Sequence, residues 1–220
     1  MQVANRNQLI KTQTQKLNLG CGNQVLPDWT NVDYALGAKL YKFPLFPWLN
    51  RQLKLFNLEW HPDIFLWDLR QHFPWEDNSI DVVYSSHTLE HFNKQQGLNF
   101  LRECYRVLQP GGIIRIVVPD LSPIVQRYCN QEVTADDFVD LLEVSYDNSH
   151  ENFIHKLIAP LIKFPHKCMY DTKTLLRIMS AVGFACQSKP PFDSEIFDID
   201  QIELLERTVD SVIVEGIKIS

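Results

Sequence analysis

The sequence has no long hydrophobic run and no CxxC motif, and each absence excludes a class of protein. The longest strongly apolar stretch, residues 113–118, contains Arg115 and is far too short to cross a bilayer. The polar first sixteen residues contain no apolar signal core. An odd number of cysteines without metal-site spacing is typical of reduced thiols, so we expect a cytoplasmic protein. The cysteines are Cys21, Cys104, Cys129, Cys168 and Cys186.

The composition is that of an ordinary globular domain. The chain has 220 residues, of which 45% are hydrophobic and 22% are charged. Its net charge of −6 provides no basic field for nucleic acid, so no nucleic-acid partner is expected. We expect a polar N-terminal lead over residues 1–15 and one domain over residues 16–220.

Strand-like and helix-like segments alternate through most of the chain. The segment 94–108 has apolar residues at helical spacing, and the Pro-Gly-Gly turn at 110–112 ends it. This alternation predicts a parallel sheet with helices on both faces. The expected strands are 17–19, 29–32, 64–66, 80–84, 113–118, 184–187 and 209–214, and further helices are expected at 134–146, 153–164 and 172–181.

Glycine and polar residues follow the expected strands. Because ligands of open α/β sheets bind outside the carboxyl ends of the strands, these positions predict one shared site. Glycine lets the backbone approach a ligand closely. An acid after the second strand can accept the hydroxyls of a ribose, and an acid after the third can face an adenine amine. The residues in strand order are Gly20, Cys21 and Gly22, then Asp33, then Asp68, then Ser85, Ser86 and His87, then Asp120.

Five segments together resemble the class I S-adenosylmethionine-dependent methyltransferases, particularly the type-11 group. The resemblance covers about residues 16–190. Its most specific parts are the third and fourth segments, which contain an acidic loop, a strand, a turn with histidine, an amphipathic helix and a Pro-Gly-Gly strand in register. The segments are LNLGCG (17–22), NVD (31–33), FPWEDNSIDVVYSSHTLEHF (73–92), ECYRVLQPGGIIRIVVPDL (103–121) and HKCMYDTKTLLRIMSAVGF (166–184).

The resemblance implies a fold, a cofactor and a set of site residues. The fold is a Rossmann-like doubly wound α/β sheet of seven mostly parallel strands, with the last strand antiparallel. The cofactor is S-adenosyl-L-methionine, the product is S-adenosyl-L-homocysteine, and no metal is expected. A helical region over residues 121–170 would shape a pocket for a small-molecule, sugar or lipid-linked glycan acceptor. The implied cofactor-binding residues are Gly20, Cys21, Gly22, Asp33, Tyr34, Asp68, Leu69, Ser85, Ser86 and His87, and the candidate general bases are His87, Asp120 and His166.

The connection between the first two strands departs from that family. Only ten residues separate Gly22 from Asp33, and Pro27 interrupts them. A crossover between parallel strands usually needs a dozen or more residues. We therefore expect the first crossover helix to be absent or reduced to a turn. The first-strand acid of the family is replaced by Asn18.

Three alternatives stay open on the sequence. A nicotinamide-dependent oxidoreductase would need G-x-G-x-x-G, but Val25 stands at the third glycine position. His87, Glu90 and His91 match the H-x-x-E-H pattern of zinc proteases, but no third ligand is apparent nearby. A domain that binds S-adenosylmethionine without catalysis has the same sequence signals.

Residues 34–60 form an aromatic and basic insertion. Between Tyr34 and Leu58 there are four basic residues and no acid. The prolines of the 41–48 segment prevent one regular helix. We expect the cluster of Phe43, Phe46 and Trp48 to be buried against the sheet surface that the reduced helix leaves bare. A lid over the acceptor site, or a peripheral contact with a membrane or partner, are the alternatives.

Overall fold

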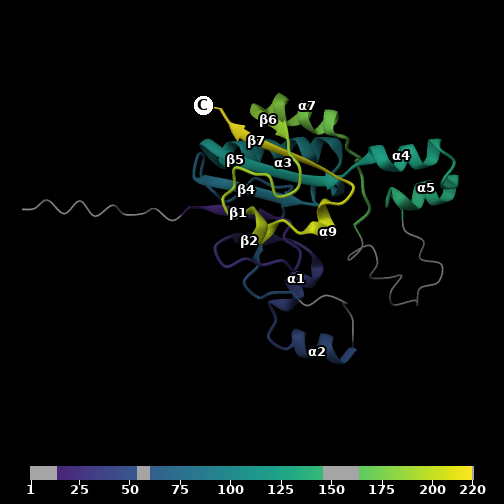
Figure 1. Ribbon diagram of the computed structural model, residues 1–220. Helices are drawn as coiled ribbons and strands as arrows, with labels where there is room; N and C mark the ends of the chain where they lie inside the picture. Colours follow the sequence, from purple (N-terminus) through teal and green to yellow (C-terminus); the bar gives the residue numbers. More distant parts are fainter. Residues whose placement is uncertain (1–13, 54–59, 146–163, 220) are drawn as a thin grey trace, which may run out of the picture.

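The computed structural model describes residues 14–53, 60–145 and 164–219 (Figure 1). Its described strands form one seven-stranded sheet in the order β3-β2-β1-β4-β5-β7-β6. All neighbouring strands pair in parallel except β7, which is antiparallel to both β5 and β6. The strands are β1 (Lys16–Leu19), β2 (Thr30–Asp33), β3 (Phe65–Leu66), β4 (Ile80–Ser86), β5 (Leu108–Pro119), β6 (Phe184–Ser188) and β7 (Ser211–Lys218). This sheet confirms the predicted fold class, including the antiparallel last strand.

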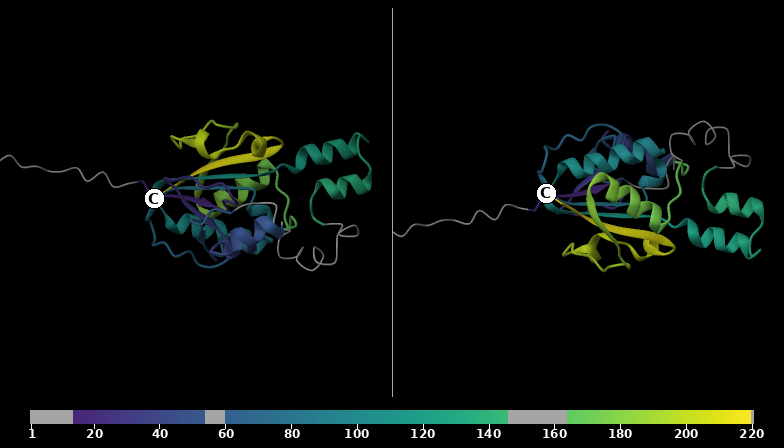
Figure 2. Two further views of the ribbon diagram at one scale, coloured as in Figure 1. Left: turned by 90° about the horizontal axis from the view of Figure 1, so that it is seen from below. Right: turned by 90° about the horizontal axis from the view of Figure 1, so that it is seen from above.

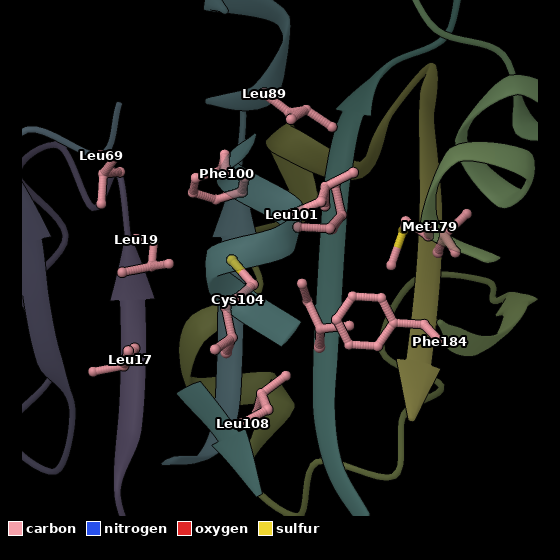
Figure 3. Close-up of a cluster of buried hydrophobic side chains, with 14 of the residues drawn as sticks. Leu17, Leu19, Leu69, Leu89, Phe100, Leu101, Cys104, Leu108, Met179 and Phe184 are labelled. Carbon is pink, nitrogen blue, oxygen red and sulfur yellow. The ribbon is translucent and has the colours of Figure 1, made fainter. Parts of the chain in front are cut away.

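Helices cover one face of the sheet and form the main core with it. The amphipathic helix α3 (Lys94–Val107) begins at a capping box between Asn93 and Gln96, and α7 (Thr172–Val182) begins at the predicted cap Asp171. Figure 3 shows Leu101 and Cys104 of α3 over the middle of the sheet and Met179 of α7 near Phe184, all in one buried cluster. Under these helices β1 and β4 pair in parallel, so their carboxyl ends lie at the same edge of the sheet.

The first crossover helix is absent, as predicted. The residues between β1 and β2 form turns, and the amide of Asn31 holds them in place. Its Nδ2 donates to the carbonyls of Leu26 and Trp29 at 2.8 and 2.9 Å, and its Oδ1 accepts from Leu26 N at 3.2 Å and from Asn18 Nδ2 at 3.1 Å. One buried side chain thus replaces a helix as the support of this connection.

The sheet face opposite α3 is covered by the segment between β6 and β7, and not by the 34–60 insertion. Ile196, Ile199 and Ile202 of this segment pack on the sheet together with Trp29. In Figure 2 this segment and α3 lie on opposite sides of the sheet. The segment includes the short helices α8 (Ile199–Ile202) and α9 (Leu205–Thr208). The insertion therefore does not cover this face, although its Ala38 packs with Cys21 and Ile64 near the β3 edge of the sheet.

A buried ion pair fixes that segment to the sheet. Arg115 of β5 is fully buried, and its Nε and Nη2 donate to the two carboxylate oxygens of Glu203 at 2.8 Å each. Its Nη1 donates to Glu215 of β7 at 3.2 Å. The cation and both anions are removed from water, so the pairing must be complete for the segment to dock.

The insertion consists of two helices, α1 (Leu36–Tyr41) and α2 (Phe46–Leu53). The break between them confirms that the prolines interrupt the helix. Ala38 and Tyr41 of α1 are buried, whereas Phe43 and Trp48 are 64% and 63% exposed. The predicted burial of this aromatic cluster was wrong for these two residues, because Trp29 and the isoleucines of the β6–β7 segment already fill the sheet face.

The predicted acceptor-side region begins with two helices that extend beyond the sheet (Figures 1 and 2). These are α4 (Leu121–Cys129) and α5 (Ala135–Leu141). Thr134 caps α5 as predicted, but the helix ends at Leu141 and does not reach residue 146. The helix expected at 153–164 lies outside the described residues except for Phe164, which is not helical. Within the described ranges, no helix is both long and apolar enough for a membrane span.

Candidate functional site

A glycine turn follows β1 and is tied to the end of β2. Gly20 N and Cys21 N both donate to the carbonyl of Val32, at 2.9 and 3.0 Å. Gly22 N donates to Asp33 Oδ2 at 2.9 Å, and Ala35 N donates to Asp33 Oδ1 at 2.7 Å. The structure therefore brings the predicted glycine turn and the predicted ribose acid together, despite the short connection between them.

Both glycines of the turn have left-handed backbone angles, with φ of +76° at Gly20 and +58° at Gly22. They face different surroundings. A Cβ at Gly20 would lie 2.0 Å from Thr88 Oγ1. A Cβ at Gly22 would have only Arg207 Nη2 within 4 Å, at 3.9 Å. Gly20 thus serves the packing of the turn on the β4 end, and Gly22 leaves open space beside a cation.

Burial and hydrogen bonds have opposite effects on the pKa of the Asp33 carboxyl. Burial raises the pKa of its carboxyl, and the N–H groups of Ala35 and Gly22 counteract part of that effect. Burial and the neighbouring Asp33 also raise the pKa of the Cys21 thiol to about 12. Cys21 is therefore an uncharged packing residue of the turn and not a nucleophile.

The residues after β3 are engaged with protein partners. Arg70 Nε and Nη2 donate to the two carboxylate oxygens of Asp68 at 2.8 and 2.6 Å, and this pairing lowers the pKa of that carboxyl. The Leu69 side chain is buried in the main core. Tyr34 is 43% exposed, and its ring lies 3.2 Å from the ammonium of Lys39.

The residues after β4 turn sharply toward α9. The Ser85 hydroxyl donates to the carbonyl of Leu19 at 2.9 Å, and Ser86 is 5% exposed. His87 has a left-handed φ of 52°, an uncommon angle for a side chain of its size. Its Nε2 is 2.9 Å from the carbonyl of Arg207. Burial lowers the pKa of the His87 imidazole.

Glu90 lies at the centre of this end of the site, although the sequence placed it only in the H-x-x-E-H pattern and not among the expected site residues. Its side chain is 1% exposed, and neither carboxylate oxygen has a hydrogen-bond partner among the described residues. Its Oε1 lies 3.6 Å from His87 Nδ1, 3.9 Å from His91 Nε2 and 4.0 Å from His166 Nε2. Burial raises the pKa of Glu90 to about 8, and burial together with His166 lowers the pKa of His91 to about 4. The H-x-x-E-H spacing was the signal that could have identified it.

Two of the three candidate bases converge on Glu90, and the third does not contact it. Asp120 caps α4, where its Oδ1 accepts from Ser122 N at 2.9 Å. His166 is 8% exposed and adjoins Glu90 because Lys167 N and Cys168 N donate to the Glu90 carbonyl at 2.8 and 3.1 Å. Arg207, in α9, lies beside Gly22 and was also missed, because no motif marks it in the sequence.

Comparison with known proteins agrees with this geometry. Residues 17–116 match the family model described as a methyltransferase domain. Over 79 residues the chain is 33% identical to a Mycolicibacterium smegmatis protein described as "Probable S-adenosylmethionine-dependent methyltransferase". That alignment spans 33% of this chain and 30% of the relative.

Solved structures share the fold at low sequence identity. The PH0226 protein of Pyrococcus horikoshii superposes with a TM-score of 0.51 at 16% identity, covering 96% of this chain and 84% of that one. The YcgJ protein of Bacillus subtilis gives a TM-score of 0.49 at 14% identity, covering 94% and 93%. The family-model match over residues 17–116 confirms the resemblance seen in the sequence, and the superposition on PH0226 supports the fold alone.

Proposed function

Because residues 17–116 match the family model of a methyltransferase domain, we propose that this protein transfers the methyl group of S-adenosylmethionine to a small-molecule, sugar or lipid-linked glycan acceptor. The observation that supports the proposal most is the glycine turn whose Gly22 N–H is bonded to Asp33 at 2.9 Å. This contact puts open backbone and a carboxylate at the carboxyl ends of β1 and β2, where an open α/β sheet binds its ligand.

The strand order favours this cofactor over a dinucleotide. The dinucleotide-binding sheet has the order 3-2-1-4-5-6 with parallel strands. In this chain the antiparallel β7 lies between β5 and β6. The turn also lacks the third glycine of the dinucleotide fingerprint, with Val25 at that position. Both features oppose the nicotinamide alternative.

The residues of the turn fit the polar groups of the proposed cofactor. Asp33 would accept from the ribose hydroxyls, since each of its oxygens accepts one backbone N–H and has a further lone pair. The guanidinium of Arg207, beside the open side of Gly22, would attract the carboxylate of the methionine part. The neighbouring Tyr34 ring, 43% exposed, is suited to stack on a base.

When bound, the cofactor supplies an electrophilic methyl group on a sulfonium that is already a good leaving group. The chain's residues would align the acceptor and, for a hydroxyl, accept its proton. His87 and His166 are the proposed bases. Each has one ring nitrogen bonded to a backbone carbonyl and the other near Glu90, which would stabilise an imidazolium when its carboxyl is ionised. Asp120 is the weaker candidate, because its carboxylate caps α4.

An acceptor screen tests the catalytic part of this proposal. The protein is incubated with S-adenosylmethionine and a panel of sugars, lipid-linked glycans and small hydroxy compounds, and S-adenosylhomocysteine is measured by mass spectrometry. We expect product only with some acceptors, and none with the Asp33→Ala variant. Cofactor binding without turnover on any acceptor would support the domain that binds S-adenosylmethionine without catalysis.

We also propose a cytoplasmic location. All five cysteines are free, as in a reducing compartment.

A peripheral membrane contact is the last part of the proposal. An exposed apolar group on the insertion, made of Phe43, Leu45 and Trp48, is suited to a membrane interface. Sedimentation with liposomes should retain the wild-type protein more strongly than Trp48→Ala. Equal retention of the two proteins would contradict the membrane contact.

A further inference from the structure

When the Glu90 carboxyl is ionised, the cluster around it contains hydrogen-bond acceptors with no hydrogen between them. A backbone carbonyl can only accept, so the imidazole nitrogen that faces it carries the hydrogen. His166 Nδ1 lies 2.9 Å from the carbonyl of Leu142, and His91 Nδ1 lies 3.5 Å from that of Pro165. In the neutral rings, the Nε2 atoms that face Glu90 therefore carry no hydrogen and present a lone pair to it.

The same reasoning applies to His87. Its Nε2 faces the carbonyl of Arg207 at 2.9 Å, so its Nδ1 presents a lone pair 3.6 Å from Glu90 Oε1. Three imidazole lone pairs and one carboxylate oxygen thus adjoin each other, and none of the separations is a hydrogen bond. A carboxylate that is 1% exposed and has no partner is costly unless a positive charge compensates it.

We propose that Glu90, His91 and His166 bind a divalent transition-metal ion, with zinc favoured. With the ion bound, His166 is a ligand, and His87 alone remains as the candidate base beside the open position. Neutral imidazole and carboxylate are the ligands that zinc takes when three protein groups leave an open position. The donor atoms of Glu90, His91 and His166 all lie within 4.8 Å of one another. Tetrahedral bonds of about 2.0–2.1 Å place neighbouring ligand atoms about 3.4 Å apart. The separations of 3.9 and 4.0 Å from Glu90 Oε1 therefore have to shorten by about 0.5 Å when an ion binds.

The surrounding backbone holds the ligands as a metal site requires. Metal-binding histidines almost always donate their second ring N–H to a carbonyl or carboxylate, and His87, His91 and His166 each have such a carbonyl. The Glu90 carbonyl accepts from Lys167 N and Cys168 N, which joins η1 (Leu89–His91) to the segment that carries His166. The ligand set is therefore assembled by the fold before any ion binds.

The sequence had favoured a metal-free protein because the H-x-x-E-H pattern lacked a third ligand nearby. His166 supplies it from 75 residues further along the chain than His91. The site adjoins His87 at the end of β4, so an open metal position would receive an oxygen or nitrogen of the methyl acceptor. That last role rests on the proposed function, whereas metal binding itself does not.

Metal binding is measured on the full chain without cofactor or acceptor. The purified protein is stripped with a chelator, loaded with zinc or cobalt(II) and desalted, and its metal content is determined by mass spectrometry. We expect one zinc ion per chain, a cobalt form with visible absorption bands of nitrogen and oxygen ligands, and a higher melting temperature with metal than without it.

Variants assign the site. Glu90→Gln and His166→Gln keep the side-chain size close to the original, and each should weaken zinc affinity more than about tenfold, the lower bound for losing even a supporting contact of a metal ligand. His72→Ala is the matched control, because His72 is an exposed histidine outside the cluster. Circular dichroism of the metal-free proteins shows whether each variant is folded.

Two results would overturn the inference: no metal retained after loading, or retention unchanged in folded Glu90→Gln and His166→Gln. In the first case the cluster holds protons and not a metal ion. Both results leave cofactor binding untouched, so they are distinguishable from failure of the proposed function. Retained zinc without S-adenosylhomocysteine binding would contradict the proposed function alone.

Discussion

The backbone N–H of Gly22 donates to Asp33 Oδ2 at 2.9 Å, although only ten residues separate the two. In a longer crossover, a helix would stand in the sequence between the glycine turn after β1 and the acid at the end of β2. In this chain the Asn31 amide holds the connection, and the acid remains beside the glycine turn. The proposed cofactor-binding turn and acid therefore lie together without the first crossover helix.

Replacing Asp33 should weaken cofactor binding with little effect on the fold. Hydrogen bonds to a charged group contribute about 1.5–3 kcal/mol, so Asp33→Asn should raise the dissociation constant for S-adenosylhomocysteine by about tenfold to a hundredfold. Isothermal titration calorimetry measures this change. Asp28→Asn, an exposed aspartate in the same connection, is the control and should bind like the wild type.

The raised pKa of Asp33 predicts a pH dependence of binding. Its carboxyl takes up a proton above its ordinary value near 3.8, so affinity for the cofactor should begin to fall at a higher pH than for an exposed aspartate. For stability the sign is opposite. The folded state holds this proton more tightly, so the group's stabilising contribution is present below 3.8 and is lost as the pH rises through the folded pKa. A binding profile that is identical in Asp33→Asn would refute the assignment.

Gly20→Ala should destabilise the protein more than Gly111→Ala. Both glycines have similar left-handed angles, with φ of +76° and +81°, so the backbone strain is matched. A Cβ at Gly20 meets Thr88 Oγ1 at 2.0 Å, whereas a Cβ at Gly111 has nothing within 4 Å. We expect the difference in unfolding free energy to be about 1–3 kcal/mol, typical of overpacking. Urea denaturation measures it, and equal losses would show that the turn does not pack on Thr88 as described.

Breaking the buried pair of Arg115 and Glu203 should be costly. Glu203→Gln leaves the Arg115 cation with incomplete compensation, and such a change typically destabilises by about 3–5 kcal/mol. Glu206→Gln, an exposed change nearby in α9, should stay within about 0.5 kcal/mol of the wild type. Thermal and urea unfolding compare the two variants. A small effect of Glu203→Gln would mean that the β6–β7 segment is not held by this pair.

Trp48→Ala should leave stability almost unchanged, whereas Trp29→Ala should lower it strongly. Trp48 is 63% exposed, so its truncation should change the unfolding free energy by less than about 0.5 kcal/mol. Trp29 is 6% exposed in the cluster that covers the sheet, and truncation of a buried tryptophan costs about 3–5 kcal/mol. A large loss in Trp48→Ala would show that α2 packs against the domain.

The sheet was predictable because local signals marked it. Apolar runs marked β1, β4 and β5, and the reduced crossover followed from a count of residues before Asp33. The cover of the opposite sheet face was not predictable. Aromatic residues in the 34–60 insertion suggested burial there, but Ile196, Ile199 and Ile202 occupy that face instead. Their segment is fixed by long-range pairing of Arg115 with Glu203, 88 residues apart, which no local pattern reveals.

The candidate site also contains residues that the sequence predicts and residues that it does not. Gly20, Gly22 and Asp33 follow strand ends, and the parallel sheet brings strand ends together, so sequence order was enough. His166 reaches Glu90 because backbone bonds from residues 167 and 168 join two distant segments. That contact depends on the path of the chain after β5, which periodicity does not determine. Arg207 lies beside the glycine turn because α9 docks there, which is also a tertiary contact that no local pattern predicts.

Calorimetric titration of the purified protein with S-adenosylhomocysteine, run beside NAD, tests the central claim most directly. The account predicts saturable binding of S-adenosylhomocysteine at one site per chain, weakened in Asp33→Asn, and no binding of NAD. Saturable NAD binding with no heat from S-adenosylhomocysteine would contradict it.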